Sequence, residues 1–256
     1  MMHELSGKTV LVTGASKGIG AAIAAASVAA GARVVAHYGT DKDGAAAATA
    51  AAPEGTVKLL AADLSEPHAA LDLVEEAIRW AGRLDCVVNN AAVMRIDGGV
   101  DSDLDRWDAV WEEAFAVNVK APADLMRAAT NHFLAVGGGT IVSISSWAAY
   151  RGMASAGGLA YAASKAATAT TTKALARAYA DKGLLAYVIV PGVVETRLSI
   201  EAAEAGAGIE AVVGALAMKE MVPPHEIGEL VVFLASGRCR HLNGAMLDVN
   251  GASYIR

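Results

Sequence analysis

The chain has 256 residues, 54% of them hydrophobic, and a formal net charge of −6. This acidic balance, with both signs scattered along the sequence, argues against a nucleic-acid or membrane-surface role, and the length fits one large α/β domain. Neither cysteine has a second Cys or a His at metal-ligand spacing, so we predict reduced thiols, no metal site and a cytoplasmic protein. Residues 1–8 hold a glutamate and no apolar core, so no signal peptide is expected.

Short apolar runs alternate with longer segments of helix-forming composition along the whole chain. Strands are predicted at 8–13, 33–37, 57–61, 84–89, 140–145, 185–190 and 245–249, and helices at 21–30, 69–80 and 164–179. An exposed helix is expected at 44–52, ending before Pro53. This alternation predicts an α/β fold: one Rossmann-like domain over 1–256, with a doubly wound parallel sheet of about seven strands and helices on both faces.

The first strand leads into a glycine-rich turn that reads Gly14-Ala15-Ser16-Lys17-Gly18-Ile19-Gly20. Glycines at these positions permit a tight turn, close approach of a pyrophosphate to the backbone, and close packing of helix on strand. The following helix start offers free N–H groups and a positive dipole end to phosphates. The turn therefore predicts a dinucleotide site.

The end of the second strand indicates which dinucleotide binds. NAD sites place an acid there, but this segment reads His37-Tyr38-Gly39-Thr40-Asp41, and Asp41 comes a few residues late. Lys17 supplies a cation for a 2′-phosphate, or is an exposed loop lysine. His37 is interpreted as a packing residue rather than a ligand. NADP(H) is favoured over NAD(H).

Two later turns also fall where strands end. Asp63, followed by Leu64, is placed either to accept from an adenine amino group or to cap the next helix. The turn Asn89-Asn90-Ala91-Ala92 has small residues that let a cofactor pass close to the backbone, although asparagines also occur in turns for local hydrogen bonding.

Tyr161 and Lys165 lie four residues apart, on one face of a predicted helix. A free phenol has a pKa of roughly 10, and a neighbouring ammonium lowers it toward the range in which general acid–base catalysis works best. A Tyr and a Lys at this spacing are also common on solvated helices. The glycine turn and the Ser145-Ser146 pair that closes an apolar strand favour the catalytic interpretation.

Taken together, these residues resemble the short-chain dehydrogenase/reductase family, in its branch of about 250 residues. The stretch 13–20 matches T-G-x-x-x-G-I-G, and 89–92 matches N-N-A-[GA]. The stretch 161–165 matches Y-x-x-x-K, Pro191-Gly192 matches the turn after the sixth strand, and 243–251 looks like the closing strand. The resemblance covers essentially the whole chain in the right order.

The resemblance implies roles for four residues. Tyr161 is the general acid/base, Lys165 lowers its pKa and holds the nicotinamide ribose, Ser146 binds the substrate oxygen, and Asn118 supports the lysine through water. The alternative for Asn118 is an exposed polar residue, but its apolar neighbours favour an inward position. The serine departs from the family pattern: Ala148 stands 13 residues before the tyrosine, and Ser146 is chosen over Ser145 because it keeps its place relative to the strand end.

The implied cofactor contacts follow the same matched motifs. They are Gly14, Ser16, Lys17, Gly18, Ile19, Gly20, Tyr38, Gly39, Thr40, Asp63, Leu64, Asn90, Ala91, Ala92, Tyr161, Lys165, Pro191, Gly192, Val194 and Thr196.

The function expected from the resemblance is NAD(P)-dependent interconversion of an alcohol and a carbonyl. The alternatives are a catalytically silent nucleotide-sensing module and an enzyme that oxidises its substrate transiently. The segment 196–222 is expected to be a largely helical lid over a mostly apolar pocket for a small-molecule substrate, with Arg151 solvated rather than a carboxylate clamp. A homotetramer or homodimer is expected, with neither nucleic acid nor a membrane as partner.

Overall fold

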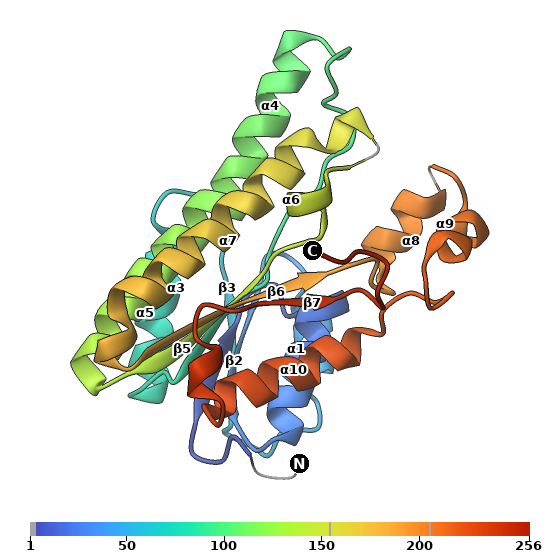
Figure 1. Ribbon diagram of the computed structural model, residues 1–256. Helices are drawn as coiled ribbons and strands as arrows, with labels where there is room; N and C mark the ends of the chain where they lie inside the picture. Colours follow the sequence, from blue (N-terminus) through green and yellow to red (C-terminus); the bar gives the residue numbers. More distant parts are fainter. Residues whose placement is uncertain (1–3, 154, 205) are drawn as a thin grey trace.

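The computed structural model describes residues 4–153, 155–204 and 206–256, and its centre is a seven-stranded parallel sheet. The strands lie in the order β3-β2-β1-β4-β5-β6-β7 (Figure 1). Their bounds are β1 (Thr9–Val12), β2 (Arg33–Tyr38), β3 (Val57–Ala61), β4 (Cys86–Asn89), β5 (Gly139–Ile144), β6 (Leu184–Pro191) and β7 (Met246–Val249). All seven predicted strands are confirmed to within two residues at each end.

Helices cover both faces of the sheet, as predicted (Figure 1). One face carries α1 (Gly18–Ala29) and α10 (Pro224–Ser236), which pack against each other. The other carries α3 (Ala69–Ala81), α5 (Ala121–Val136) and α7 (Leu159–Tyr179). A further helix, α4 (Leu104–Phe115), packs against α7 and continues through a π-helical turn, Ala116–Lys120, into α5.

The apolar strand sequences follow from this two-sided burial. Successive side chains of a strand point to opposite faces, so Val10 and Val12 of β1 join the core under α1 and α10, while Leu11 joins the core under α3 and α5. All three are fully buried. A strand covered on both faces therefore has no position for a solvated side chain.

The shorter elements refine the expectations. The predicted helix 44–52 is α2 (Lys42–Ala48), four residues shorter at its end, where the Thr49 and Ala50 amides donate to the Ala46 and Ala47 carbonyl oxygens in tighter turns. The segment 196–222 contains α8 (Arg197–Glu204) and α9 (Ile209–Ala215), and α6 (Ala148–Arg151) follows β5. No helix of the described chain has the length and apolar character needed to cross a membrane.

The strand order fixes where a ligand binds. Because all strands are parallel, their carboxyl ends share one edge of the sheet, and the chain leaves β1 and β4 toward opposite faces. Open α/β sheets bind ligands in the crevice outside the carboxyl ends at this switch point. The glycine turn after β1 and the asparagine turn after β4 both lie there.

The contact between α1 and α10 gives a test of this packing. A Cβ on Gly228 would lie 2.7 Å from the Ala22 carbonyl oxygen, whereas a Cβ on Gly214 in α9 would meet nothing within 4 Å. Gly228→Ala is expected to lower the free energy of unfolding by about 1–3 kcal/mol, because the helices must separate. Gly214→Ala, the matched control, should raise it by up to about 1 kcal/mol. Urea unfolding measures both; an unchanged midpoint for Gly228→Ala would contradict the described packing.

Candidate active site

The glycine turn after β1 is packed so closely that side chains are excluded. A Cβ on Gly20 would lie 2.0 Å from the Gly14 carbonyl oxygen, and Gly18 has φ of +55° and lies against the Thr196 methyl group. Helix α1 begins at Gly18. The side chain of its N-cap residue, Lys17, makes no capping hydrogen bond, and its first turn has no acid. Its first N–H groups and positive dipole end are therefore free to receive an anion.

The tip of β2 presents open space beside this turn. A Cβ on Gly39 would meet nothing within 4 Å, and the Lys17 side chain is exposed. The Asp41 carboxylate caps α2 by accepting from the Gly44 amide at 2.8 Å, and the Ser16 hydroxyl donates to the Asp41 carbonyl at 2.6 Å. Asp41 is thus engaged in capping a helix, with its main chain tied to the glycine turn.

The structure excludes one of the two alternatives for Asp63, that it caps the next helix. Helix α3 begins only at Ala69, and the Asp63 Oδ1 atom instead accepts from the Ser65 amide at 2.9 Å and its hydroxyl at 2.6 Å. These hydrogen bonds lower the pKa of Asp63. The carboxylate is exposed after β3, while the neighbouring Leu64 is buried in the core.

Asn90 ties the turn after β4 to the glycine turn. Its Nδ2 atom donates to the Thr13 carbonyl at 2.8 Å and to the Gly14 carbonyl at 3.2 Å. The Thr13 hydroxyl accepts from the Asn90 and Ala91 amides at 2.9 and 3.1 Å and donates to Val88. Sequence reasoning did not predict this structural role of Thr13, although the threonine is the first residue of the matched glycine motif.

Tyr161 lies in the first turns of α7, partly exposed, with Ser146 beside it. Burial raises the pKa of the Tyr161 phenol, and hydrogen bonding to the Ser146 hydroxyl opposes that rise. Ser145 is turned away: its hydroxyl donates to the Lys165 carbonyl oxygen at 3.0 Å. The structure thus brings Ser146, rather than Ser145, to the phenol.

Lys165 is buried beneath the tyrosine. The residue is only 5% exposed, and its Nζ atom lies 5.8 Å from the centre of the Tyr161 ring. Nζ donates to the Ile144 carbonyl oxygen at 2.9 Å. Burial lowers the pKa of Lys165 to about 8, because the ammonium has lost its hydration.

Asn118 lies in the π-helical turn between α4 and α5, and is 2% exposed. Its amide pairs with both main-chain groups of Val93, accepting from N and donating to O at 2.8 Å each, and donates to the Ser164 hydroxyl at 3.0 Å. The Thr168 hydroxyl donates to the Asn118 carbonyl. The inward position of Asn118 is confirmed, and π-turns of this kind are frequent at functional sites. Its support of the lysine through water stays a prediction.

The remaining predicted residues follow β4 and β6 or lie beside the glycine turn. Gly192 is close to Asn250, and its amide donates to the Val249 carbonyl at 2.9 Å. Val194 is buried and forms a bridge with Val222, which closes the base of the segment 196–222. Other predicted contacts at this carboxyl edge are Ile19, Tyr38, Thr40, Ala92 and Pro191.

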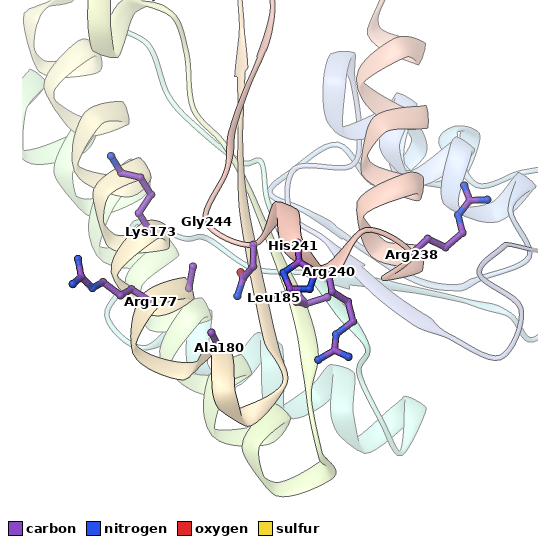
Figure 2. A pocket seen from close by; sticks show the side chains of 10 residues that line it. Lys173, Arg177, Ala180, Leu185, Arg238, Arg240, His241 and Gly244 are labelled. Carbon is purple, nitrogen blue, oxygen red and sulfur yellow. The ribbon is translucent and has the colours of Figure 1, made fainter.

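A basic cavity of about 830 Å³ lies at the opposite, amino ends of β6 and β7. Its lining includes Lys173, Arg177, Arg238, Arg240 and His241. Figure 2 shows Lys173 and Arg177 leaving α7 on the side away from Arg240, with Arg238 directed away from both. The cations do not converge on a common point, and the cavity lies away from the glycine turn and Tyr161.

Comparison with known proteins agrees with this geometry. A family model described as enoyl-(acyl carrier protein) reductase matches residues 14–252. D-threitol dehydrogenase of Mycolicibacterium smegmatis is 32% identical over 99% of this chain and 95% of its own length. D-beta-hydroxybutyrate dehydrogenase of Cupriavidus necator is 33% identical over 96% of this chain and 98% of its own.

Solved structures show the same likeness. The crystal structure of a 3-oxoacyl (acyl-carrier-protein) reductase from Agrobacterium tumefaciens with NADP bound superposes with a TM-score of 0.85. It is 32% identical in sequence, and the match covers 96% of this chain and 94% of that one. The chain belongs to the short-chain dehydrogenase/reductase family of oxidoreductases.

Proposed function

We propose that the protein interconverts a small-molecule alcohol and its carbonyl compound with NADP(H), using Tyr161 as general acid/base. One observation carries this proposal: the Tyr161 phenol, with Ser146 beside it and the buried Lys165 beneath it, lies at the sheet edge that also carries the glycine turn. A proton donor, an oxygen-binding hydroxyl and a dinucleotide cradle in one crevice are the groups that such a reaction needs.

The residues present fit a dinucleotide. A Cβ would fill the cradle at Gly18 and Gly20, and the uncapped start of α1 would hold the pyrophosphate. Asn90 and Ala91 line the turn on the other side of the switch point, and the exposed Asp63 carboxylate has an oxygen free for an adenine amino group. The cofactor supplies or accepts the hydride when bound.

In the reduction direction, Tyr161 donates its phenolic proton to the carbonyl oxygen as negative charge develops there. The Ser146 hydroxyl donates a hydrogen bond to the same oxygen and so stabilises that charge. The ammonium of Lys165, when protonated, favours the resulting phenolate. In the oxidation direction, the phenolate accepts the alcohol proton.

The open tip of β2 supports a preference for NADP(H). Asp41 comes after the tip of β2 rather than at it, and its Oδ1 atom accepts from Gly44 in the cap of α2. Gly39 leaves room for a larger group, and the exposed Lys17 supplies a cation nearby. A 2′-phosphate fits this arrangement better than a hydroxyl does.

Segment 196–222 serves, in this proposal, as a lid over the substrate. Thr196 at its start lies against Gly18 of the cradle, and α8 and α9 expose Leu198 and Ile209. Few large apolar side chains hold it to the core, which favours opening. Arg151 is exposed, with its guanidinium 4.3 Å from the centre of the Trp147 ring, which supports a solvated arginine rather than a carboxylate clamp.

Self-association, as a homodimer or homotetramer, is also proposed. The edge strand β7 has three apolar residues that are only partly buried, and Leu104 and Phe115 of α4 are exposed, at 77% and 39%. A symmetric contact would cover such faces.

The chemistry is tested by Tyr161→Phe, which removes the proton donor and keeps the ring. Turnover should fall by at least roughly 10²–10⁴-fold, the contribution of general acid–base assistance, with the melting temperature unchanged. The control is Tyr179→Phe at the far end of α7. NADPH absorbance with a panel of carbonyl compounds follows turnover, and wild-type rates in a folded Tyr161→Phe protein would overturn the assignment.

Cofactor choice is tested by fluorescence titration. Wild type should bind NADPH more tightly than NADH, and Lys17→Ala should weaken NADPH binding by roughly 1.5–3 kcal/mol, the value of a charge-assisted hydrogen bond, while sparing NADH. Lys182→Ala, another exposed lysine at the amino end of β6, is the control. Equal affinities for the two cofactors in wild type would refute the preference.

The burial of Lys165 predicts a pH dependence of stability. Between its folded pKa of about 8 and the ordinary value of 10.5, the unfolded chain holds a proton that the folded chain has released. The buried ammonium therefore lowers stability by about 3 kcal/mol below that window, and this cost is relieved as the pH rises through it.

Urea unfolding of the cofactor-free protein at several pH values from 7 to 10, compared with Lys165→Met, measures this effect. The difference between variant and wild type should favour the variant most at pH 7 and shrink toward pH 10. A difference that does not change with pH would show that the lysine is not desolvated.

A further inference from the structure

His37 lies at the end of β2, between the glycine turn and the chain that leaves β3. It is 2% exposed, and both of its ring nitrogens have main-chain partners. The Gly14 amide lies 3.1 Å from Nδ1, and the Ala62 carbonyl oxygen lies 3.0 Å from Nε2. Its own carbonyl oxygen accepts from the Ala15 amide at 2.8 Å. Each polar atom of this buried ring is thus paired with a main-chain group, one of them in the glycine turn.

These partners fix the chemical form of the imidazole. An N–H group such as that of Gly14 needs an acceptor, so Nδ1 carries no proton, and a carbonyl oxygen such as that of Ala62 needs a donor, so Nε2 carries it. The ring is therefore neutral in one tautomer. Burial also lowers the pKa of His37, in the same direction.

The contact completes the fixing of the Thr13–Gly14 peptide group, whose carbonyl oxygen accepts from Asn90 Nδ2 at 2.8 Å and whose N–H is held by His37. Gly14 has φ of +67°, its carbonyl oxygen accepts from Asn90, and its amide is held by His37. Both main-chain groups of the first glycine are thus bound by side chains from different strands. The same imidazole reaches Ala62, directly before Asp63, so it connects the phosphate side of the crevice with its adenine side.

We propose that His37 is a positioning residue for the dinucleotide: through Nδ1 it holds the Gly14 peptide in the orientation that shapes the phosphate cradle. This inference rests on the proposed cofactor binding. His37 itself does not touch the cofactor; it acts through the glycine turn, so its loss should affect cofactor affinity far more than the chemical step.

Two substitutions separate this role from simple packing. Asparagine places its Oδ1 atom where histidine has Nδ1, so His37→Asn keeps the acceptor for Gly14 and loses the donor to Ala62. Glutamine places its Nε2 atom near the position of the histidine Nε2, so His37→Gln keeps the donor and loses the acceptor. Glutamine is also the closer match in volume, so a packing role predicts that glutamine is the better replacement.

The positioning role predicts the opposite order. His37→Gln should raise the Kd for NADPH by about 3- to 10-fold, within the worth of one hydrogen bond, and His37→Asn should stay within about twofold of wild type. At saturating NADPH both should keep the wild-type kcat and the KM for the carbonyl compound. Fluorescence titration, steady-state kinetics and melting temperatures of the three proteins give these values.

The outcomes are distinct. Equal affinity of His37→Gln and wild type, or tighter binding by His37→Gln than by His37→Asn, would overturn the positioning role. Failure of wild type to bind either NADPH or NADH would instead overturn the proposed function. If a variant does not fold, ¹⁵N NMR of the wild-type imidazole at pH 7 decides: a proton on Nε2 alone is expected, and a proton on Nδ1 would refute the contact with Gly14.

Discussion

The hydrogen bonds between Thr13 and Asn90 are the constraint on which the site depends. They join β1 and β4, the two neighbouring strands from which the chain departs to opposite faces of the sheet. They extend the connection between the two strands beyond the end of the parallel β1–β4 pairing and into the turns that follow. Because Asn90 also binds the Gly14 carbonyl, the same side chain sets the position of the phosphate cradle. The turns after β1 and β4, which the proposed function assigns to the cofactor, are thereby built as one hydrogen-bonded unit.

Burial disfavours the charged forms of Tyr161 and Lys165, on which their proposed chemistry depends. It raises the pKa of the phenol and lowers that of the ammonium, so each group is driven toward its neutral form. The surrounding structure offsets this: Ser146 lies at the phenol, and the Ile144 carbonyl accepts from the lysine. A desolvated ammonium interacts more strongly with a developing phenolate than a hydrated one does, since the local dielectric is low. In the proposed function, the cost in folding stability and the gain in catalysis come from the same burial.

The sequence predicted the fold well because its signals were local. Continuous apolar runs between helical segments located all seven strands, and fixed motif spacings located the turns at their carboxyl ends. What the sequence left open or placed differently depends on tertiary and turn contacts. Helix α2 ends earlier than predicted, in tighter turns at Thr49 and Ala50, and the partner of Asp63 is Ser65 rather than a helix end. His37 was interpreted as a packing residue rather than a ligand and is buried, but nothing in its neighbours in sequence reveals an acceptor aimed at Gly14. Sequence motifs identify the residues that contact a ligand more readily than the residues that hold those contacts in position.

The contact between Gly18 and Thr196 connects the two ends of the site. Gly18 begins the helix proposed to bind phosphate, and Thr196 begins the segment proposed to cover the substrate. A Cβ on Gly18 would come within 3.1 Å of the threonine methyl group, so the glycine lets the turn and the start of segment 196–222 pack together. Any group that stiffens the glycine turn therefore limits the positions open to Thr196. In the proposed function, this direct packing would link cofactor binding to closure of the segment, with Gly14 held by His37 at the start of the turn and Thr196 resting on Gly18 further along it.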